Sequence, residues 1–203
     1  MKNYFFLLLV LISNLIYSQK NIEIDTLTYK NLKNQYDSNF KKNKRALTQE
    51  KFFKFIRVLE LKADLACKTE TEECSSIKYL LGLAIREKMY QIHQPKNEID
   101  SLLFYHNYLI EKSLDNYSLA KSAIIVSQAM LNKSDITGFL DKTYESIEYF
   151  KKSDSKYAPT NKFTCYQNLI RIYGLNGYQN FAFQTLNIFE TELNALKNDE
   201  QYD

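Results

Sequence analysis

The sequence predicts an all-α protein built from about four antiparallel helical hairpins. Three observations support this fold class. Apolar residues recur at helical spacing along almost the whole chain of 203 residues. Only 4 Gly and 2 Pro occur, whereas β-sandwiches and barrels need frequent turn residues. Apolar residues make up 45% and charged residues 25% of the chain, so it can bury a core rather than remain disordered.

Composition also narrows the classes of function. The four glycines are too scattered to form the GxGxxG or GxxxxGK loops that hold phosphates. A net charge of +3 is too small to indicate a surface that binds nucleic acid. The two histidines belong to no HExxH pair, and the three cysteines form no CxxC motif. We therefore expect no nucleic-acid partner, no cofactor and no metal site.

The first 18 residues have the layout of a secretory signal peptide. Lys2 gives the positive start, nine consecutive apolar residues cover 4–12, and Ser18 precedes the expected cleavage point. The alternative is an uncleaved membrane anchor. A spanning helix needs about 20 apolar residues, however, and this run breaks at Ser13. The sequence thus predicts cleavage, export to the periplasm or the extracellular space, and a helical domain over 19–203 without a membrane span.

Four helices are expected in the first half of this domain. We place them at about 26–43, from Thr48 to about 66, at 76–93, and from Asn97 to about 110. Thr48 and Asn97 are candidate N-caps, and the polar segment QPKN at 94–97 separates the third helix from the fourth. His106 lies on the apolar face of the fourth helix, which favours a core histidine over a catalytic base.

The second half is expected to hold four more helices. The fifth and sixth cover about 116–132 and 135–152, and a polar break at 153–160 precedes the seventh. The eighth covers about 178–197, and the tail after it should fray. It carries apolar residues on more than one side: Phe181, Phe183, Leu186, Ile188, Phe189 and Leu193. We expect another subunit or a partner to cover this end, and a homodimer through the last helix is one way to do so.

Three cysteines matter because export permits disulfides. Cys67 and Cys74 bracket the polar loop 68–73, so both lie at the same end of the hairpin formed by the second and third helices. A disulfide between them is geometrically reasonable, and two partly buried thiols are the alternative. Cys165 is left over, and we expect it to be a buried structural thiol rather than a nucleophile.

The C-terminal hairpin carries a spacing typical of a repeat family. Its framework positions are Tyr166, Leu169, Ile170, Tyr173, Ala182 and Leu186. They resemble the tetratricopeptide repeat (TPR) pattern W-x2-L-G-x2-Y…A-x3-F, most clearly over residues 163–196, although Ile170 stands where the family has a small residue. Ser146 and Phe150 repeat the small-x3-large pair 36 residues earlier, close to the family's period of about 34.

The resemblance implies an α-solenoid in which the first helices of successive hairpins line a groove for a protein or peptide ligand. In the best-matched hairpin Thr164, Gln167 and Arg171 would face that groove, with Arg171 pairing with a carboxylate of the ligand. The expected function is a non-enzymatic interaction or scaffold module of the bacterial cell envelope. The alternative is a small helical envelope enzyme acting on cell-wall or glycan substrates, which predicts a pocket with two acidic groups, at least one with a raised pKa.

Overall fold

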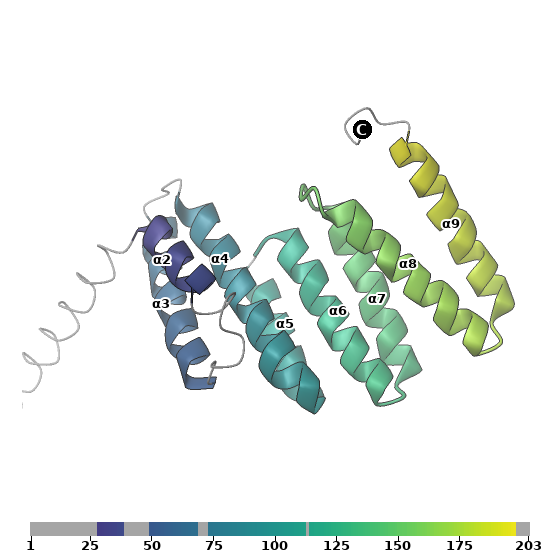
Figure 1. Ribbon diagram of the computed structural model, residues 1–203, viewed down its shortest axis with the longest axis horizontal. Helices are drawn as coiled ribbons and strands as arrows, with labels where there is room; N and C mark the ends of the chain where they lie inside the picture. The colour runs from purple at the N-terminus through teal and green to yellow at the C-terminus, as the bar shows by residue number, and fades with distance from the viewer. Residues whose placement is uncertain (1–27, 39–48, 69–72, 113, 198–203) are drawn as a thin grey trace, which may run out of the picture. The chain divides into compact units, whose positions relative to one another are not determined.

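The computed structural model describes residues 28–38, 49–68, 73–112 and 114–197 (Figure 1). Eight α-helices and no strand occur in these ranges, which confirms the all-α fold class. The expected signal peptide at 1–18 and the C-terminal tail lie outside the described residues. None of the described helices is long and apolar enough to cross a membrane.

The chain divides into two compact units, one up to Lys88 and one from Met89. The described residues of the two units lie between 28 and 197. The boundary lies inside the helix predicted at 76–93, at the point where the α-helix passes into a π-helical turn.

The first unit contains α2 (Tyr29–Tyr36), α3 (Gln49–Lys68) and α4 (Glu73–Lys88). Thr28 caps α2 by accepting a hydrogen bond from the backbone of Asn31, and α2 lies along α4. α3 packs along α4. The largest fully buried hydrophobic side chains of this unit are Leu32, Phe52, Leu59, Ile77, Leu80, Leu81 and Ile85. Each such residue stabilises the fold by about 1.5–3 kcal/mol through its transfer from water.

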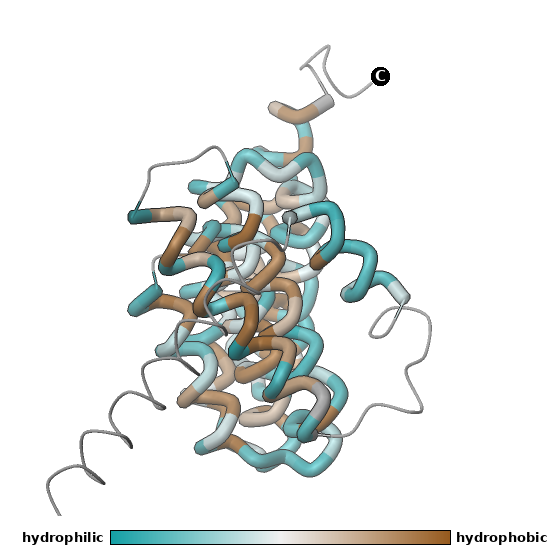
Figure 2. Tube along the Cα trace, turned by 90° about the vertical axis from the view of Figure 1, so that its left-hand side faces the viewer, coloured by the Kyte–Doolittle hydropathy of each residue, from teal (hydrophilic) through white to brown (hydrophobic). Residues whose placement is uncertain are grey.

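The second unit begins with a π-helical turn, η3 (Met89–His93), and a 3-10 turn, η4 (Gln94–Lys96). Five α-helices follow: α5 (Ile99–Glu111), α6 (Asn116–Asn132), α7 (Ile136–Lys151), α8 (Ala158–Leu175) and α9 (Gln179–Lys197). Each of the five packs against the next one in the chain, as Figure 1 shows. Hydrophobic and hydrophilic segments alternate along the helices of the chain (Figure 2), as expected of helices that each present an apolar face to a neighbour.

Several helix ends differ from the sequence prediction. α4 begins at Glu73 rather than at about 76 and ends at Lys88, and the candidate cap Thr48 lies outside the described residues. The break at 94–97 is confirmed, but Asn97 does not cap α5: it adopts a left-handed conformation with φ 51°, and Glu98 occupies the N-cap position. Asn97 therefore closes the preceding 3-10 turn instead. The break at 153–160 is also too long, because α8 already begins at Ala158 with Pro159 in its first turn, where a missing N–H costs nothing.

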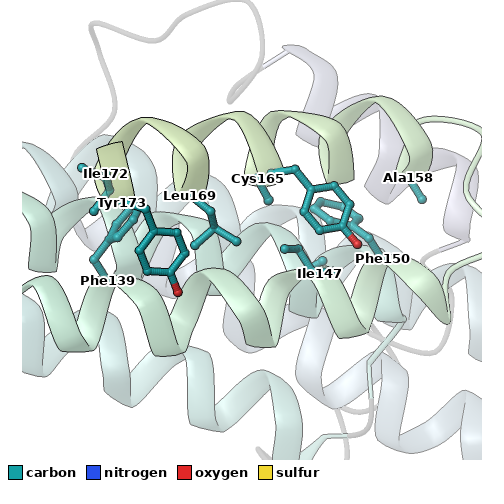
Figure 3. Packing of buried hydrophobic residues seen from close by; sticks show 10 residues of the cluster. Phe139, Ile147, Phe150, Ala158, Cys165, Leu169, Ile172 and Tyr173 are labelled. Carbon is teal, nitrogen blue, oxygen red and sulfur yellow. The ribbon is translucent and has the colours of Figure 1, made fainter. Parts of the chain in front are cut away.

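The main core of the second unit lies where α6, α7 and α8 meet. Its buried residues are Ala120, Phe139, Ile147, Phe150, Ala158, Cys165, Tyr166, Leu169, Ile172 and Tyr173. Figure 3 shows the side chains of α8 pointing toward those of α7. Ala182 and Phe189 of α9 pack against the same cluster, so α8 is held on both sides. This leaves one side of α8 for solvent.

Candidate functional site

The solvent-facing side of α8 carries the residues that the sequence singled out. Thr164, Gln167 and Arg171 are all exposed, whereas Cys165, Leu169 and Ile172 on the opposite side are buried. The spacing of three and four residues explains this division, because it returns a side chain to the same face of a helix. The structure thus brings the three predicted contact residues together on one exposed face.

A chain of hydrogen bonds joins this part of α8 to α6. The Lys121 ammonium on α6 donates to the Oδ1 atom of Asn161 at 3.1 Å, and the Asn161 amide donates to the Tyr117 hydroxyl at 3.3 Å. Lys121 and Tyr117 are half-buried, so the surface of α6 continues that of α8. We call the surface formed by Tyr117, Lys121, Asn161, Thr164, Gln167 and Arg171 the α6–α8 face.

The charge of the α6–α8 face has a single sign. Neither α6 nor α8 contains an Asp or a Glu, while Lys121, Lys162 and Arg171 are basic. Lys162 is neutralised by Glu192 of α9 at 2.7 Å. Arg171, by contrast, forms no ion pair among the described residues. Its guanidinium can therefore take a carboxylate supplied from outside the chain.

An apolar contact site lies beside Arg171. Leu175 is four residues further along α8 and is 76% exposed, which makes it the most exposed large hydrophobic residue of the described chain. A Cβ atom added at Gly174 would meet no atom within 4 Å, so the surface between the two side chains is open. The α6–α8 face thus offers a cation next to an apolar side chain.

Sequence reasoning identified the α8 half of this face and missed the α6 half. Asn161 lies 40 positions from Lys121 and 44 positions from Tyr117 in the chain. These residues meet because α6 and α8 pack together. No local spacing reports such a contact. The absence of acidic residues from both segments was the one signal in the sequence that could have linked them.

The cysteines separate into a bonded pair and a single thiol. Cys67 at the end of α3 and Cys74 at the start of α4 form a disulfide, with Cα atoms 4.9 Å apart. Cys165 is free and buried. Burial raises the pKa of the Cys165 thiol to about 11, although a hydrogen bond with Ser146 and the charge of Lys121 act in the opposite direction. Such a thiol is a poor nucleophile at neutral pH.

A buried hydrogen-bond network surrounds His106. Its Nδ1 atom lies 2.7 Å from the Ser122 hydroxyl, and its Nε2 atom lies 2.9 Å from Oε1 of Glu145. The other carboxylate oxygen of Glu145 accepts from Lys142 at 2.6 Å. The side chain of His106 is fully buried, so the prediction of a core histidine is confirmed.

This network contains the residue types of a hydrolase triad but not its accessibility. Ser122 is fully buried and donates its hydroxyl proton to the backbone oxygen of Leu119 at 2.8 Å. A nucleophile must instead face the substrate, with its proton directed to the base. We therefore interpret Ser122, His106 and Glu145 as a structural link between α5, α6 and α7.

The resolved pKa shifts of carboxyl groups in the described residues are all downward. A hydrogen bond from Lys54 lowers the pKa of Glu50, and one from His93 lowers that of Glu98. For Glu145 burial acts upward, but the hydrogen bonds from His106 and Lys142 outweigh it and hold the pKa at about 2. Within the described ranges, no group of three or more His, Cys, Asp or Glu side chains is placed to hold a metal ion.

Comparisons with protein-family models, with curated proteins and with solved structures find no match to this chain. The TPR resemblance therefore remains a prediction from the residues named above.

Proposed function

We propose that the chain is an exported, non-enzymatic interaction module of the bacterial cell envelope, with TPR-like hairpins in an α-solenoid. Its ligand is a protein or peptide segment that presents a carboxylate next to an apolar side chain. One observation carries this proposal: Arg171 and Leu175 are exposed side by side on a surface without acidic residues. Charge complementarity of this kind selects partners and speeds their encounter.

The arrangement of the C-terminal hairpin supports the TPR-like part of the proposal. The large framework residues Tyr166, Leu169 and Tyr173 are buried, as the family's spacing requires. Ala182 packs against the α8 cluster, where a small side chain lets α9 approach α8 closely. The helices of the second unit also pack in chain order, which is the connectivity of a solenoid.

Two features support export. Residues 1–18 have the pattern of a signal peptide, and the Cys67–Cys74 disulfide suits an oxidising compartment. In cytosolic proteins glutathione and thioredoxin would keep such a pair reduced. Export places the α6–α8 face among envelope or extracellular proteins rather than cytosolic ones.

Binding at this face needs no chemical step. The guanidinium of Arg171 would form paired hydrogen bonds with a carboxylate, and the amide of Gln167 would bond to the ligand backbone. Leu175 would be covered by an apolar side chain of the ligand. A hydrogen bond to a charged group contributes about 1.5–3 kcal/mol, so loss of Arg171 should weaken binding roughly tenfold or more.

The test is affinity capture from solubilised envelope, with the full chain as bait and the captured proteins identified by mass spectrometry. The variant Gln167→Ala/Arg171→Glu should lose a protein that the wild type retains. Lys156→Glu is the matched control, because Lys156 is also exposed and lies outside the α6–α8 face. In a direct titration, a captured protein should bind the wild type and Lys156→Glu with similar affinity, and the double variant more weakly.

Equal capture by all three baits would contradict the assignment of the site. The absence of any specifically captured protein would contradict the proposed function.

The enzyme alternative stays an untested prediction. It requires an acidic group with a raised pKa, and the shifts resolved in the described residues are in the other direction. A screen of the full chain for hydrolysis of cell-wall fragments and glycans would test that alternative.

A further inference from the structure

A row of uncharged side chains runs along the outer side of α9. These residues are all exposed and alternate at spacings of three and four: Phe181, Gln184, Ile188, Thr191 and Ala195. We call them the α9 stripe. Such spacing keeps side chains along one seam of a helix, as in pairs of packed helices. The side of α9 that packs inward carries Ala182 and Phe189. Among the stripe residues, Phe181 also stacks on the Tyr173 ring of α8 with centroids 5.5 Å apart, while more than half of its surface stays exposed.

The α9 stripe and its surroundings hold an unusual share of exposed hydrophobic surface. Of the 12 exposed large hydrophobic residues in the described chain, five lie between 175 and 188. Phe181 is 54% exposed and Ile188 50% exposed. Tyr178 is 53% exposed and its ring contacts that of Phe181, with centroids 6.4 Å apart. Exposed apolar surface of this density marks an interaction site.

Charge favours a second copy of the chain as the occupant. Residues 178–189 contain no charged side chain, and the exposed Glu190 lies at a position of α9 off the stripe. Glu192 contacts two residues of α8. Its Oε2 atom lies 2.7 Å from Nζ of Lys162, and its Oε1 atom accepts a hydrogen bond from the Tyr166 hydroxyl at 2.9 Å. Two copies of the stripe therefore meet without opposing like charges, which would otherwise penalise a symmetric contact.

The shape of the stripe is also self-complementary. Phe181 and Ala195 lie seven residues on either side of Ile188. In an antiparallel pair centred on Ile188, Phe181 of one copy faces Ala195 of the other, a large side chain against a small one. Gln184 comes close to Thr191 of the other copy, where an amide and a hydroxyl can share a hydrogen bond.

We propose that two copies of the chain associate through the α9 stripe, antiparallel and with the two-fold axis at Ile188. A helix of 19 residues is about 28 Å long. Phe181 is the one aromatic residue of the stripe, and a half-exposed aromatic side chain contributes on the order of 100 Å² of surface. The interface is therefore smaller than the roughly 1,000 Å² of a stable specific contact, and we expect a weak, reversible dimer.

Sedimentation velocity of the purified full chain from about 1 to 200 μM tests this proposal. We expect a concentration-dependent dimer, and Ile188→Glu should raise its dissociation constant at least tenfold. Phe183→Glu is the matched control: Phe183 is 62% exposed on the same helix but lies off the stripe, so its substitution should leave association unchanged. Circular dichroism of each variant reports whether the fold is retained. Residues 1–18 are the same in all variants and cannot cause a difference between them.

Crosslinking tests the geometry itself. In the antiparallel pair the two copies of residue 188 face each other, so Ile188→Cys should yield a disulfide-linked dimer under mild oxidation. Phe183→Cys should not. A wild type that is monomeric at 200 μM, equal weakening by Ile188→Glu and Phe183→Glu, or equal crosslinking of both cysteine variants would each overturn the proposal. These results do not depend on the α6–α8 face.

Discussion

The Nε2 atom of His106 lies 2.9 Å from the Oε1 atom of Glu145, although the two residues are 39 positions apart in the chain. His106 belongs to α5 and Glu145 to α7, and Ser122 on the intervening α6 bonds to the other ring nitrogen. A single buried side chain thus fixes how three successive helices lie along one another. Because all three residues are polar, a shift of any one helix would leave a buried group without its partner.

Replacing Glu145 should destabilise the protein. Glu145→Gln removes the charge that His106 and Lys142 share, and we expect a loss of about 2 kcal/mol in the free energy of unfolding. Glu148→Gln is the control on the same helix. Glu148 and its partner Lys151 are 60% and 43% exposed, so this change should cost less than about 0.5 kcal/mol. Urea denaturation at neutral pH measures both values, and equal effects would contradict the structural role of the network.

The same carboxylate predicts a pH dependence of stability. The pKa of Glu145 is about 2 in the folded protein, below its ordinary value of 4.5. The unfolded chain therefore takes up the proton first as the pH falls. The stabilisation is complete above about pH 4.5 and is lost progressively between 4.5 and 2. Unfolding free energies measured from pH 7 to 3 should decrease more steeply for the wild type than for Glu145→Gln. Parallel curves would argue against this assignment.

Two glycines near the α8–α9 turn should respond to alanine in opposite ways. A Cβ atom at either Gly174 or Gly177 meets no atom within 4 Å, so only the backbone distinguishes them. Gly174 is helical, and Gly174→Ala should stabilise the fold by about 0.5 kcal/mol. Gly177 has φ +78°, and Gly177→Ala should cost about 1 kcal/mol. Thermal denaturation measures both changes, and a shift of the same sign for both would contradict the turn geometry.

Thiol counting tests the assignment of all three cysteines. The native protein should react with no equivalent of a thiol reagent at pH 7–8, because Cys165 is buried with a raised pKa and the other two are bonded. Denaturation should expose one thiol, and reduction should raise the number to three. In the chain-entropy model, the disulfide that closes the short loop between Cys67 and Cys74 stabilises the fold by about 2.5 kcal/mol. Reduction should therefore lower the free energy of unfolding by about this amount. Three reactive thiols without reduction would contradict the disulfide.

Much of the fold could be predicted from the sequence because helical periodicity and helix stop signals are local. The segment QPKN ends one helix where Pro95 removes a backbone donor, and Asp115 and Asp135 cap α6 and α7. The scarcity of glycine and proline excluded most sheet folds, because the turns between strands need these residues at particular positions.

The part that could not be predicted depends on contacts between distant residues. Nothing in the sequence near His106 indicates that Ser122 and Glu145 complete its hydrogen bonds. Lys121 likewise reaches the exposed surface of α8 by its hydrogen bond to Asn161, 40 positions away in the chain. The α8 half of the candidate site was predictable because its three residues share one helix face. Asn97 was assigned wrongly because a left-handed residue that ends a 3-10 turn looks like an N-cap in sequence.

The most direct test of the proposed binding function is photo-crosslinking in intact cells, with a photoreactive amino acid at position 167 of the full chain. The same amino acid at position 156 is the control, because both side chains are exposed and only Gln167 lies on the α6–α8 face. The account predicts a discrete adduct with an envelope protein at position 167, reduced by Arg171→Glu and absent at position 156. Adducts of equal yield at both positions, or none at position 167, would contradict it.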